Sequence, residues 1–213
     1  MSLSLSLVLS LALVTLFVTT KTAAGAVTAW TDIEVRVYDA TGLNATTRQA
    51  ALDLANAALA AASVEIAWQI CGVARPHPLR CDTRLTQAEL AIRIVRTAFA
   101  AHQESGLRLG DAFIDSQSGR GVLATIYLDR VQLLSERTGR PLATLLGRAI
   151  AHELGHLLMA SNTHGPIGLM RAFWSQDEVR SSRTSDWTFS PRDAHAIEVG
   201  AKNIRARGAW GTN

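Results

Sequence analysis

Two histidines and a glutamate in the C-terminal third of the chain have the spacing that metal-assisted hydrolysis requires. His152, Glu153 and His156 form an H-E-x-x-H motif within the run AHELGHLL at positions 151–158. On an α-helix, residues four apart lie on nearly the same face, so both histidines can bind one metal ion. Glu153 lies one position round the helix and can act as general base for the attacking water. The motif therefore predicts a zinc site.

The sequence around the motif predicts the helix that these residues need. Pro141 suits a first helical turn. Apolar residues then recur at helical spacing, at Leu142, Leu145, Leu146, Ala149, Ile150, Leu154, Leu157 and Leu158. A polar group buried in such a helix costs roughly 1 to 3 kcal/mol if it has no partner. A metal ion would satisfy all three polar residues at once, which favours a metal site over a chance motif on a surface helix.

A third protein ligand is expected after the motif, because a catalytic zinc ion keeps its fourth position open. His164 lies in the segment SNTHGPIG at 161–168, which must end the helix and turn the chain, and Leu169 and Met170 follow. At this point the chain resembles the metzincin metalloproteases, in which a turn, a third histidine and a methionine-containing turn follow the second histidine. The resemblance implies that His164 is the third zinc ligand, with Leu169 and Met170 forming an apolar floor below the metal.

The spacing of the third ligand departs from the usual metzincin pattern. That pattern places a glycine three residues after the second histidine and the third histidine six residues after it. Here those positions hold Met159 and Asn162, so His164 needs a loop that is two residues longer. A thermolysin-like arrangement would instead use Glu178, and Asn162 is a further alternative. We favour His164, because imidazole is a common zinc ligand and the methionine nearby fits its turn.

The remaining pattern predicts a mixed domain. Apolar alternation predicts strands at 33–38, 64–71, 90–95 and 122–128, and an alanine-rich segment predicts a helix at 46–62. A last helix is expected to start at Ser190 and run to about Ile204. Together with the metzincin resemblance, this order implies an α+β fold: a metzincin-like zincin with a mixed twisted sheet, a backing helix, the H-E-x-x-H active-site helix, and a small C-terminal subdomain that ends in a helix.

Several residues outside the motif are candidates for the cleft. In the resembled family the last strand before the active-site helix is an edge strand, which implies that 122–128 can pair with an extended peptide; an ordinary buried strand is the alternative. Trp174 and Trp187 either line a specificity pocket or close a small core. Arg171 is a candidate for a second oxyanion donor. His195, in the last helix, is expected to be a packed or surface residue.

The N-terminus predicts export. Residues 3–18 are apolar apart from serines and a threonine, and Lys21 and small residues up to Ala26 follow. This pattern predicts a signal peptide at 1–26, cleaved after Ala26, and a secreted or periplasmic protein. The apolar run is short for a membrane span of about 20 residues, although an uncleaved anchor is the alternative because no Lys or Arg precedes the run.

The mature chain, 27–213, is expected to be a single zinc metallopeptidase domain with an upper part at 27–160 and a lower part at 161–213. Its length suits one domain with a sizeable core. Only the short segment 27–32 separates the proposed cleavage site from the first strand, so we expect no folded pro-domain between them.

The two cysteines and the net charge indicate which cross-link and which kinds of partner to expect. Cys71 and Cys81 are expected to form a disulfide in an exported protein, with metal binding together with His77 as the alternative. The chain has 21 Lys and Arg against 18 Asp and Glu, a net charge of +3. Because its arginines are scattered and no aromatic stripe accompanies them, we expect no nucleic-acid partner. We expect no stable membrane association after signal removal, because no later apolar run approaches the length of a membrane span. The expected partner is a peptide or protein substrate. The sequence does not indicate an oligomeric state.

The predicted function is therefore that of a secreted zinc metallopeptidase, specifically a metalloendopeptidase, with Zn²⁺ as cofactor. Its metal ligands would be His152, His156 and His164, and Glu153 would be the general base. A non-catalytic, zinc-stabilised peptide-binding module is the alternative. Structural zinc sites usually have four protein ligands and often contain cysteine, whereas this chain offers three histidines and a glutamate left for catalysis.

Overall fold

The structure, a computed structural model, describes residues 33–72, 79–97, 107–181 and 183–210, with only the backbone of Ala209 and Trp210. All of these residues belong to one compact unit that begins at Thr31. The proposed signal peptide at 1–26 lies outside the described residues, as do His77 and His102. Within the described ranges, no helix is long and apolar enough to span a membrane.

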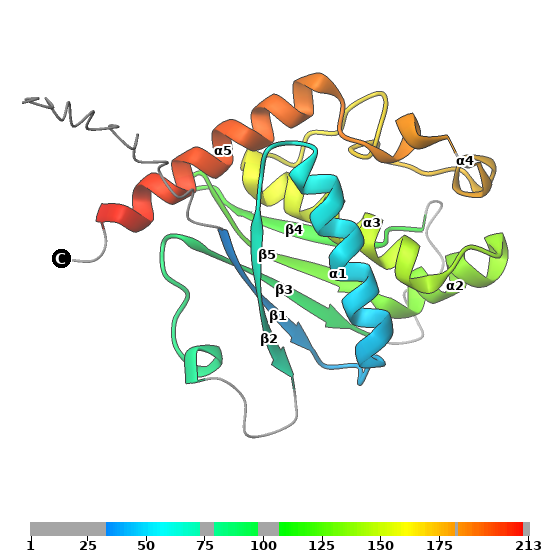
Figure 1. The fold of residues 1–213 in the computed structure, drawn as a ribbon, viewed down its shortest axis with the longest axis horizontal. Coiled ribbons are helices and arrows are strands. Elements are labelled where there is room, and N and C mark those ends of the chain that lie inside the picture. The colour runs from blue at the N-terminus through cyan, green and yellow to red at the C-terminus, as the bar shows by residue number, and fades with distance from the viewer. Residues whose placement is uncertain (1–32, 73–78, 98–106, 182, 211–213) are drawn as a thin grey trace, which may run out of the picture. The chain divides into compact units, whose positions relative to one another are not determined.

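Strands dominate the first half of the described chain, and helices dominate the second half (Figure 1). In chain order the elements are β1 (Ile33–Asp39), α1 (Ala45–Ala60), β2 (Ile66–Gly72), the 3-10 helix η1 (Leu79–Asp82), β3 (Glu89–Val95), β4 (Gly110–Asp115), β5 (Arg120–Tyr127), α2 (Leu128–Thr138), α3 (Leu142–Met159), α4 (Gln176–Arg180), the 3-10 helix η3 (Thr184–Trp187) and α5 (Pro191–Trp210). The four predicted strands correspond to β1, β2, β3 and β5, and the predicted helices to α1, α3 and α5. β4, α2 and α4 were not predicted.

The strands form one mixed sheet in the order β2-β1-β3-β5-β4. All neighbours are parallel except β4, which pairs antiparallel with β5. Of the two alternatives for 122–128, the edge strand is therefore wrong and the ordinary interior strand is right, because β5 lies between β3 and β4. The chain reverses between Asp115 and Arg120 through Gly119, which has a positive φ of 62°. This tight hairpin adds β4 to the outside of the sheet and makes β4 the edge strand.

One face of the sheet packs against α1 and α3, which lie side by side (Figure 1). Val35 and Val37 of β1 are fully buried in the same apolar cluster as Leu52 of α1 and Ile150 of α3. Side chains alternate between the two faces of a strand, so Arg36 and Tyr38 point to the opposite face. Among the described residues, the helices therefore form a continuous core on one side of the sheet, and α3 lies at its centre.

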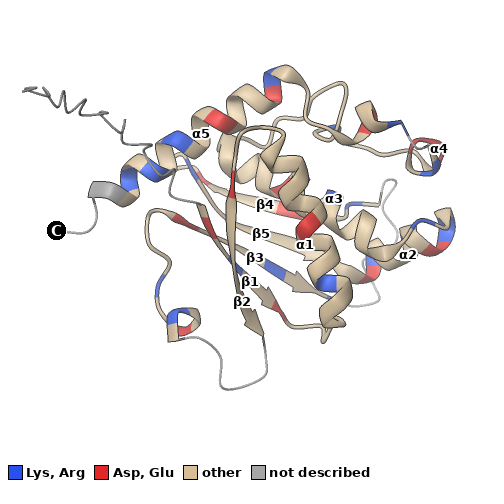
Figure 2. Cartoon of the chain, in the orientation of Figure 1, with Lys and Arg blue, Asp and Glu red and all other residues tan. Residues whose placement is uncertain are grey.

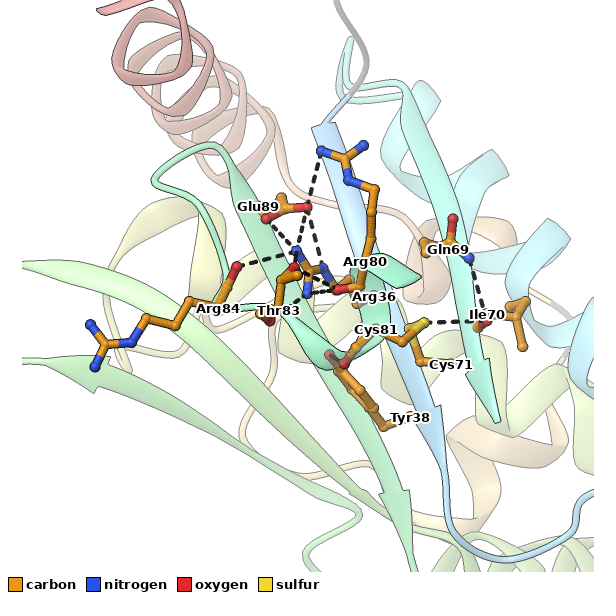
Figure 3. Close-up of a disulfide and its surroundings, with 10 residues drawn as sticks. All are labelled: Arg36, Tyr38, Gln69, Ile70, Cys71, Arg80, Cys81, Thr83, Arg84 and Glu89. Atoms are coloured by element: carbon orange, nitrogen blue, oxygen red, sulfur yellow. Dashed lines mark hydrogen bonds and ion pairs between the residues drawn. A yellow bond between two sulfur atoms is a disulfide. The ribbon is translucent and has the colours of Figure 1, made fainter. Parts of the chain in front are cut away.

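The opposite face of the sheet contains a buried ion pair. Figure 2 shows charged residues on the strands as well as on the helices. Two of the charged strand residues, Arg36 and Glu89, are almost completely buried, with 1% and 2% of their side chains exposed. Arg36 Nη2 lies 2.8 Å from Glu89 Oε2. Arg36 also donates to the backbone carbonyls of Arg80 and Thr83 (Figure 3). The guanidinium thus joins β1 and β3 to the segment that contains η1.

A disulfide holds the same segment against the sheet. Cys71 of β2 and Cys81 of η1 are bonded, with their Cα atoms 5.5 Å apart, as the sequence predicted (Figure 3). The alternative of a metal site made from these two cysteines is excluded by the bond. The hydroxyl of Tyr38 donates to the carbonyl of Cys81 at 3.2 Å. Cross-link and hydrogen bonds together keep η1 over the face of the sheet that the helices leave open.

We predict that Glu89→Gln strongly destabilises the fold, because it leaves the Arg36 charge buried and unpaired. Loss of one partner of a buried pair costs about 3 to 5 kcal/mol, whereas replacement of both partners is often close to neutral. The free energy of unfolding, measured by urea denaturation, should therefore fall sharply in Glu89→Gln and recover in Glu89→Gln/Arg36→Met. Glu198→Gln, which breaks the exposed pair with Lys202 on α5, is the matched control and should change little.

The same pair should make stability depend on acid pH. Burial by itself raises the pKa of Glu89, but hydrogen bonds from Thr86 and Arg36 outweigh it and hold the pKa below its ordinary value of 4.5. A carboxyl whose pKa is lower in the folded state stabilises above its unfolded pKa and loses this contribution as pH falls through the folded pKa. Below about pH 4.5, the free energy of unfolding of the parent should therefore fall relative to that of the double variant. A difference that is constant from pH 7 to pH 3 would contradict this account.

Candidate metal centre

Helix α3 carries the H-E-x-x-H motif into the interior. Its N-cap is Pro141, and the helix continues without a break to Met159. His152, Glu153 and His156 are 8%, 6% and 3% exposed, although all three are polar. Polar groups at this depth need partners, so the positions of their side chains indicate what the site can bind.

The end of α3 turns the chain back toward these histidines. Ala160 is the C-cap and has a left-handed conformation, with φ of 48°, although it is not glycine. The N–H of Ser161 donates to the carbonyl of His156 at 3.1 Å, which closes the turn. The reversal thus occurs one residue later than the glycine position of the usual metzincin pattern. The loop that follows places His164 beside the helix.

The three histidines meet at their Nε2 atoms. His156 Nε2 lies 3.1 Å from His152 Nε2 and 3.2 Å from His164 Nε2. One ring nitrogen of each histidine lies within 4.8 Å of the others, and this is the group of potential metal ligands found among the described residues. The structure therefore brings together the three histidines that the sequence analysis selected.

The hydrogen bonds of the outer ring nitrogens determine which nitrogens carry protons. His152 Nδ1 lies 2.8 Å from the carbonyl oxygen of Leu169, and His156 Nδ1 lies 2.7 Å from that of Ser161. A carbonyl only accepts, so we assign the proton of each neutral ring to Nδ1. The Nε2 lone pairs of His152 and His156 then face each other with no proton between them. Such an arrangement is repulsive unless a cation lies among the nitrogens.

The surroundings also favour neutral rings. Burial lowers the pKa of His152 to about 3, against the opposing effect of its hydrogen bond to Leu169. Burial likewise lowers the pKa of His156 and of His164. Neutral imidazoles are the form that binds metal. Tetrahedral zinc ligands at about 2.0–2.1 Å lie roughly 3.3 Å from each other, which matches the distances from His156 Nε2 to His152 Nε2 and His164 Nε2. The site therefore fits a zinc ion.

Glu153 lies beside the histidines in an apolar setting. The pKa of Glu153 is raised to about 8, first by burial and then by the charge of Asp111, while the charge of Arg108 acts in the opposite direction. A nearby cation favours the ionised carboxylate, which is the form that a general base needs. Gly110 of β4 lies directly against this side chain, because a Cβ atom there would be 2.6 Å from Glu153 Cγ and Oε1. Glycine at position 110 therefore lets the edge strand approach the Glu153 side chain.

A cleft surrounds the four residues. One wall is the segment 107–112, which leads into and begins β4, and the other includes Phe173 and Trp174. Leu134 and Ala149 provide apolar lining, and Asn162, Arg171 and Ala172 complete it. Glu153 and the three histidines thus line a cleft between the edge of the sheet and the loop after the histidines.

Apolar and aromatic residues support the histidines from below. Met170 is fully buried, and a Cβ atom on Gly155 would lie 2.7 Å from its Sδ atom, so the methionine packs directly under the motif. Trp174 meets the ring of His152 edge-on at 5.8 Å and that of Trp187 at 5.2 Å. Trp174 therefore lines the cleft while Trp187, 9% exposed, belongs to the core. The core role is thus confirmed for Trp187, and a role of Trp174 in specificity stays a prediction.

The other candidate residues have different environments. Glu178 forms the capping box of α4 with Ser175 and pairs with Arg171, so its carboxylate is already engaged. Arg171 lines the cleft, but it donates to Glu178 and to the carbonyls of Gly168 and Asp186. Asn162 lines the cleft and is exposed. His195 is exposed on α5, outside the histidine cluster.

We predict that His164→Ala loses zinc and that Glu178→Ala keeps it. Loss of an outer-shell partner typically costs 10 to 100-fold in metal affinity, so loss of a direct ligand should cost at least about 100-fold. Zinc affinity can be measured by competition with a chromogenic chelator, with Asn162→Ala as a further test and His195→Ala as the matched histidine control. A His164→Ala protein that holds zinc as tightly as its parent, beside a Glu178→Ala protein that does not, would favour the thermolysin-like ligand set.

Comparison with known proteins identifies the fold. No protein-family model matches the sequence, and no curated protein matches it either. Among solved structures, archaemetzincin from Methanopyrus kandleri superposes with a TM-score of 0.55 at 15% sequence identity, over 80% of this chain and 96% of archaemetzincin. At this identity the likeness concerns the fold. The chain therefore has a mixed α and β fold similar to that of archaemetzincin, in agreement with the expected fold class.

Proposed function

We propose that this protein is a zinc-dependent peptidase that hydrolyses peptide bonds with Glu153 as general base. The observation that carries the proposal is the convergence of the Nε2 atoms of His152, His156 and His164 beside Glu153, inside an open cleft. Three histidines leave one position of a tetrahedral metal open, as in catalytic zinc sites. The similarity in fold to archaemetzincin supports the same assignment.

The residues of the chain have distinct tasks in this reaction. His152, His156 and His164 would hold the zinc ion, which when bound lowers the pKa of water and polarises a carbonyl oxygen. Glu153 accepts the proton of the attacking water as the carbonyl carbon is attacked, and then donates it to the leaving amine. The carbonyls of Leu169 and Ser161 keep the imidazoles oriented, since they fix the tautomer of His152 and His156.

The edge strand β4 can position a peptide substrate. Its pairing with β5 uses one side of the strand, and the segment that leads into it borders the cleft beside Glu153. An extended peptide can add to such an edge through main-chain hydrogen bonds, with side chains that alternate between the cleft and solvent. The role that the resemblance implied for 122–128 is thus transferred to β4, and we infer that a peptide or protein is the substrate.

We further infer that the enzyme acts outside the cytosol. The segment 1–26 has the sequence pattern of a signal peptide, and the bonded Cys71–Cys81 pair is typical of proteins from oxidising compartments. Determination of the N-terminus of the protein recovered from culture medium or periplasm tests this inference, with residue 27 as the expected first residue.

We predict that Glu153→Gln binds zinc with the stoichiometry of the parent but has little activity. The amide cannot accept a proton, and the loss of a general base typically lowers turnover by about 10² to 10⁴. Zinc content by elemental analysis and cleavage of casein or gelatin measure the two properties. A Glu153→Gln protein that cleaves at the parental rate would show that Glu153 is not the base.

The same assay separates the peptidase from a non-catalytic zinc module. Cleavage by the parent should disappear with a chelator and return when zinc is added in slight excess. A binding module would show no zinc-dependent cleavage of casein, gelatin or a mixed peptide library, although it would still bind zinc. Two observations favour the enzyme: the cluster of three histidine ligands, and a Glu153 carboxylate that lines the cleft and makes no ion pair with another described residue.

A further inference from the structure

We propose that Arg108 binds a carboxylate group of the peptide substrate at the wall of the cleft, which would make the enzyme selective for substrates that carry a carboxylate near the scissile bond. The inference rests on the proposed peptidase function. The carboxylate has two possible sources, the C-terminus of the substrate and an Asp or Glu side chain, and both present the same planar group to a guanidinium.

The position of Arg108 follows from the contact between β4 and Glu153. Gly110, two residues further on, touches the Glu153 side chain so closely that a Cβ atom has no room there. Arg108 itself lines the cleft together with His156 and His164. Its charge contributes to the electrostatic surroundings of Glu153, His156 and His164 alike. The guanidinium is therefore within reach of a substrate bound at the histidines.

The backbone at Arg108 is fixed while its side chain remains accessible. The carbonyl of Arg108 accepts from Arg130 Nη1 at 3.0 Å, and the carbonyl of the next residue, Leu109, accepts from the N–H of Tyr127 at 2.9 Å. The Arg108 side chain is nonetheless 68% exposed. A fixed backbone with an accessible side chain suits a group that must meet a ligand, because little of the main chain has to be ordered on binding.

Two arginines line the cleft, and their hydrogen bonds differ. Arg171 uses its donors on Glu178 and on two backbone carbonyls, so it belongs to the framework of the loop. Arg108 makes a single ion pair among the described residues, from Nη2 to Asp111 Oδ1 at 2.8 Å. A guanidinium has five N–H donors, so one carboxylate partner leaves a face for a second. Of the two cleft arginines, Arg108 is thus the one whose guanidinium has N–H donors available for a ligand.

Asp111 modulates this site. It lies three residues after Arg108, lines the same cleft and is 44% exposed. Its negative charge competes with an incoming carboxylate for the same guanidinium. Removal of the Asp111 charge should therefore strengthen carboxylate binding, whereas removal of Arg108 should weaken it. Substitutions of the two residues are thus expected to change carboxylate binding in opposite directions, which a general effect on folding could not produce.

The test measures binding to the zinc-loaded Glu153→Gln protein, so that no turnover interferes. The probes are hexa-alanine labelled at its N-terminus with an uncharged fluorophore and carrying a free C-terminal carboxylate, the same peptide as C-terminal amide, and amide peptides with a single Glu or Gln at each position. Fluorescence anisotropy gives the Kd of each. We expect the Kd of a neutral peptide to be about ten times the Kd of its carboxylate counterpart. This ratio of Kd values should be smaller at high salt. The free C-terminus and the Glu series identify the source of the carboxylate.

Variants made in the same background decide the assignment. Arg108→Ala should reduce the ratio to about one without weakening binding of the neutral peptides, and Asp111→Asn should increase it. Arg192→Ala, which removes an exposed arginine on α5 away from the cleft, should leave the ratio unchanged. Equal affinity of the parent for charged and neutral peptides, no binding of either, or a ratio that survives Arg108→Ala would each overturn the proposal. Cleavage assays on the active parent are read separately, so failure of the peptidase assignment remains distinguishable.

Discussion

The burial of α3 on every side is the constraint on which the rest of the structure depends. Glycines on its neighbours make this burial possible. A Cβ atom on Gly121 of β5 would lie 2.3 Å from the backbone of Leu157, and a Cβ atom on Gly200 of α5 would lie 1.8 Å from the carbonyl oxygen of Leu158. Strand and helix therefore contact α3 at backbone distance. Because interiors are close-packed, the helix cannot slide or rotate without separating both neighbours.

This burial explains the arrangement of the polar residues on α3. His152 and His156 are removed from water, so each ring must direct both nitrogens at a partner. The outer nitrogens find the carbonyls of Leu169 and Ser161, and the inner nitrogens converge with that of His164. The orienting carbonyls come from the chain after the helix. The site is thus a product of the helix and of its following loop together, with Met170 packed beneath them.

The sequence predicted the elements whose signals are local. The motif, its helix, the disulfide and the strands β1, β2, β3 and β5 could be read from spacing and apolar alternation. Sheet order could not, because the antiparallel position of β4 depends on pairing between segments and its sequence GDAFID has weak alternation. The sequence already favoured His164 over Glu178, but the place where the chain reverses could not be predicted, because Ala160 has a left-handed conformation that alanine rarely adopts.

The cross-link between Cys71 and Cys81 makes the sheet sensitive to the redox state of its surroundings. Arg80, next to Cys81, offers the carbonyl that Arg36 uses, so both features hold the same segment. Reduction would free this segment to move. The carbonyl oxygens that accept hydrogen bonds from the buried Arg36 guanidinium would then be held less firmly. Protein produced in a reducing cytosol should therefore be more readily degraded than protein exported to an oxidising compartment, and thiol reagents used during purification would have the same effect.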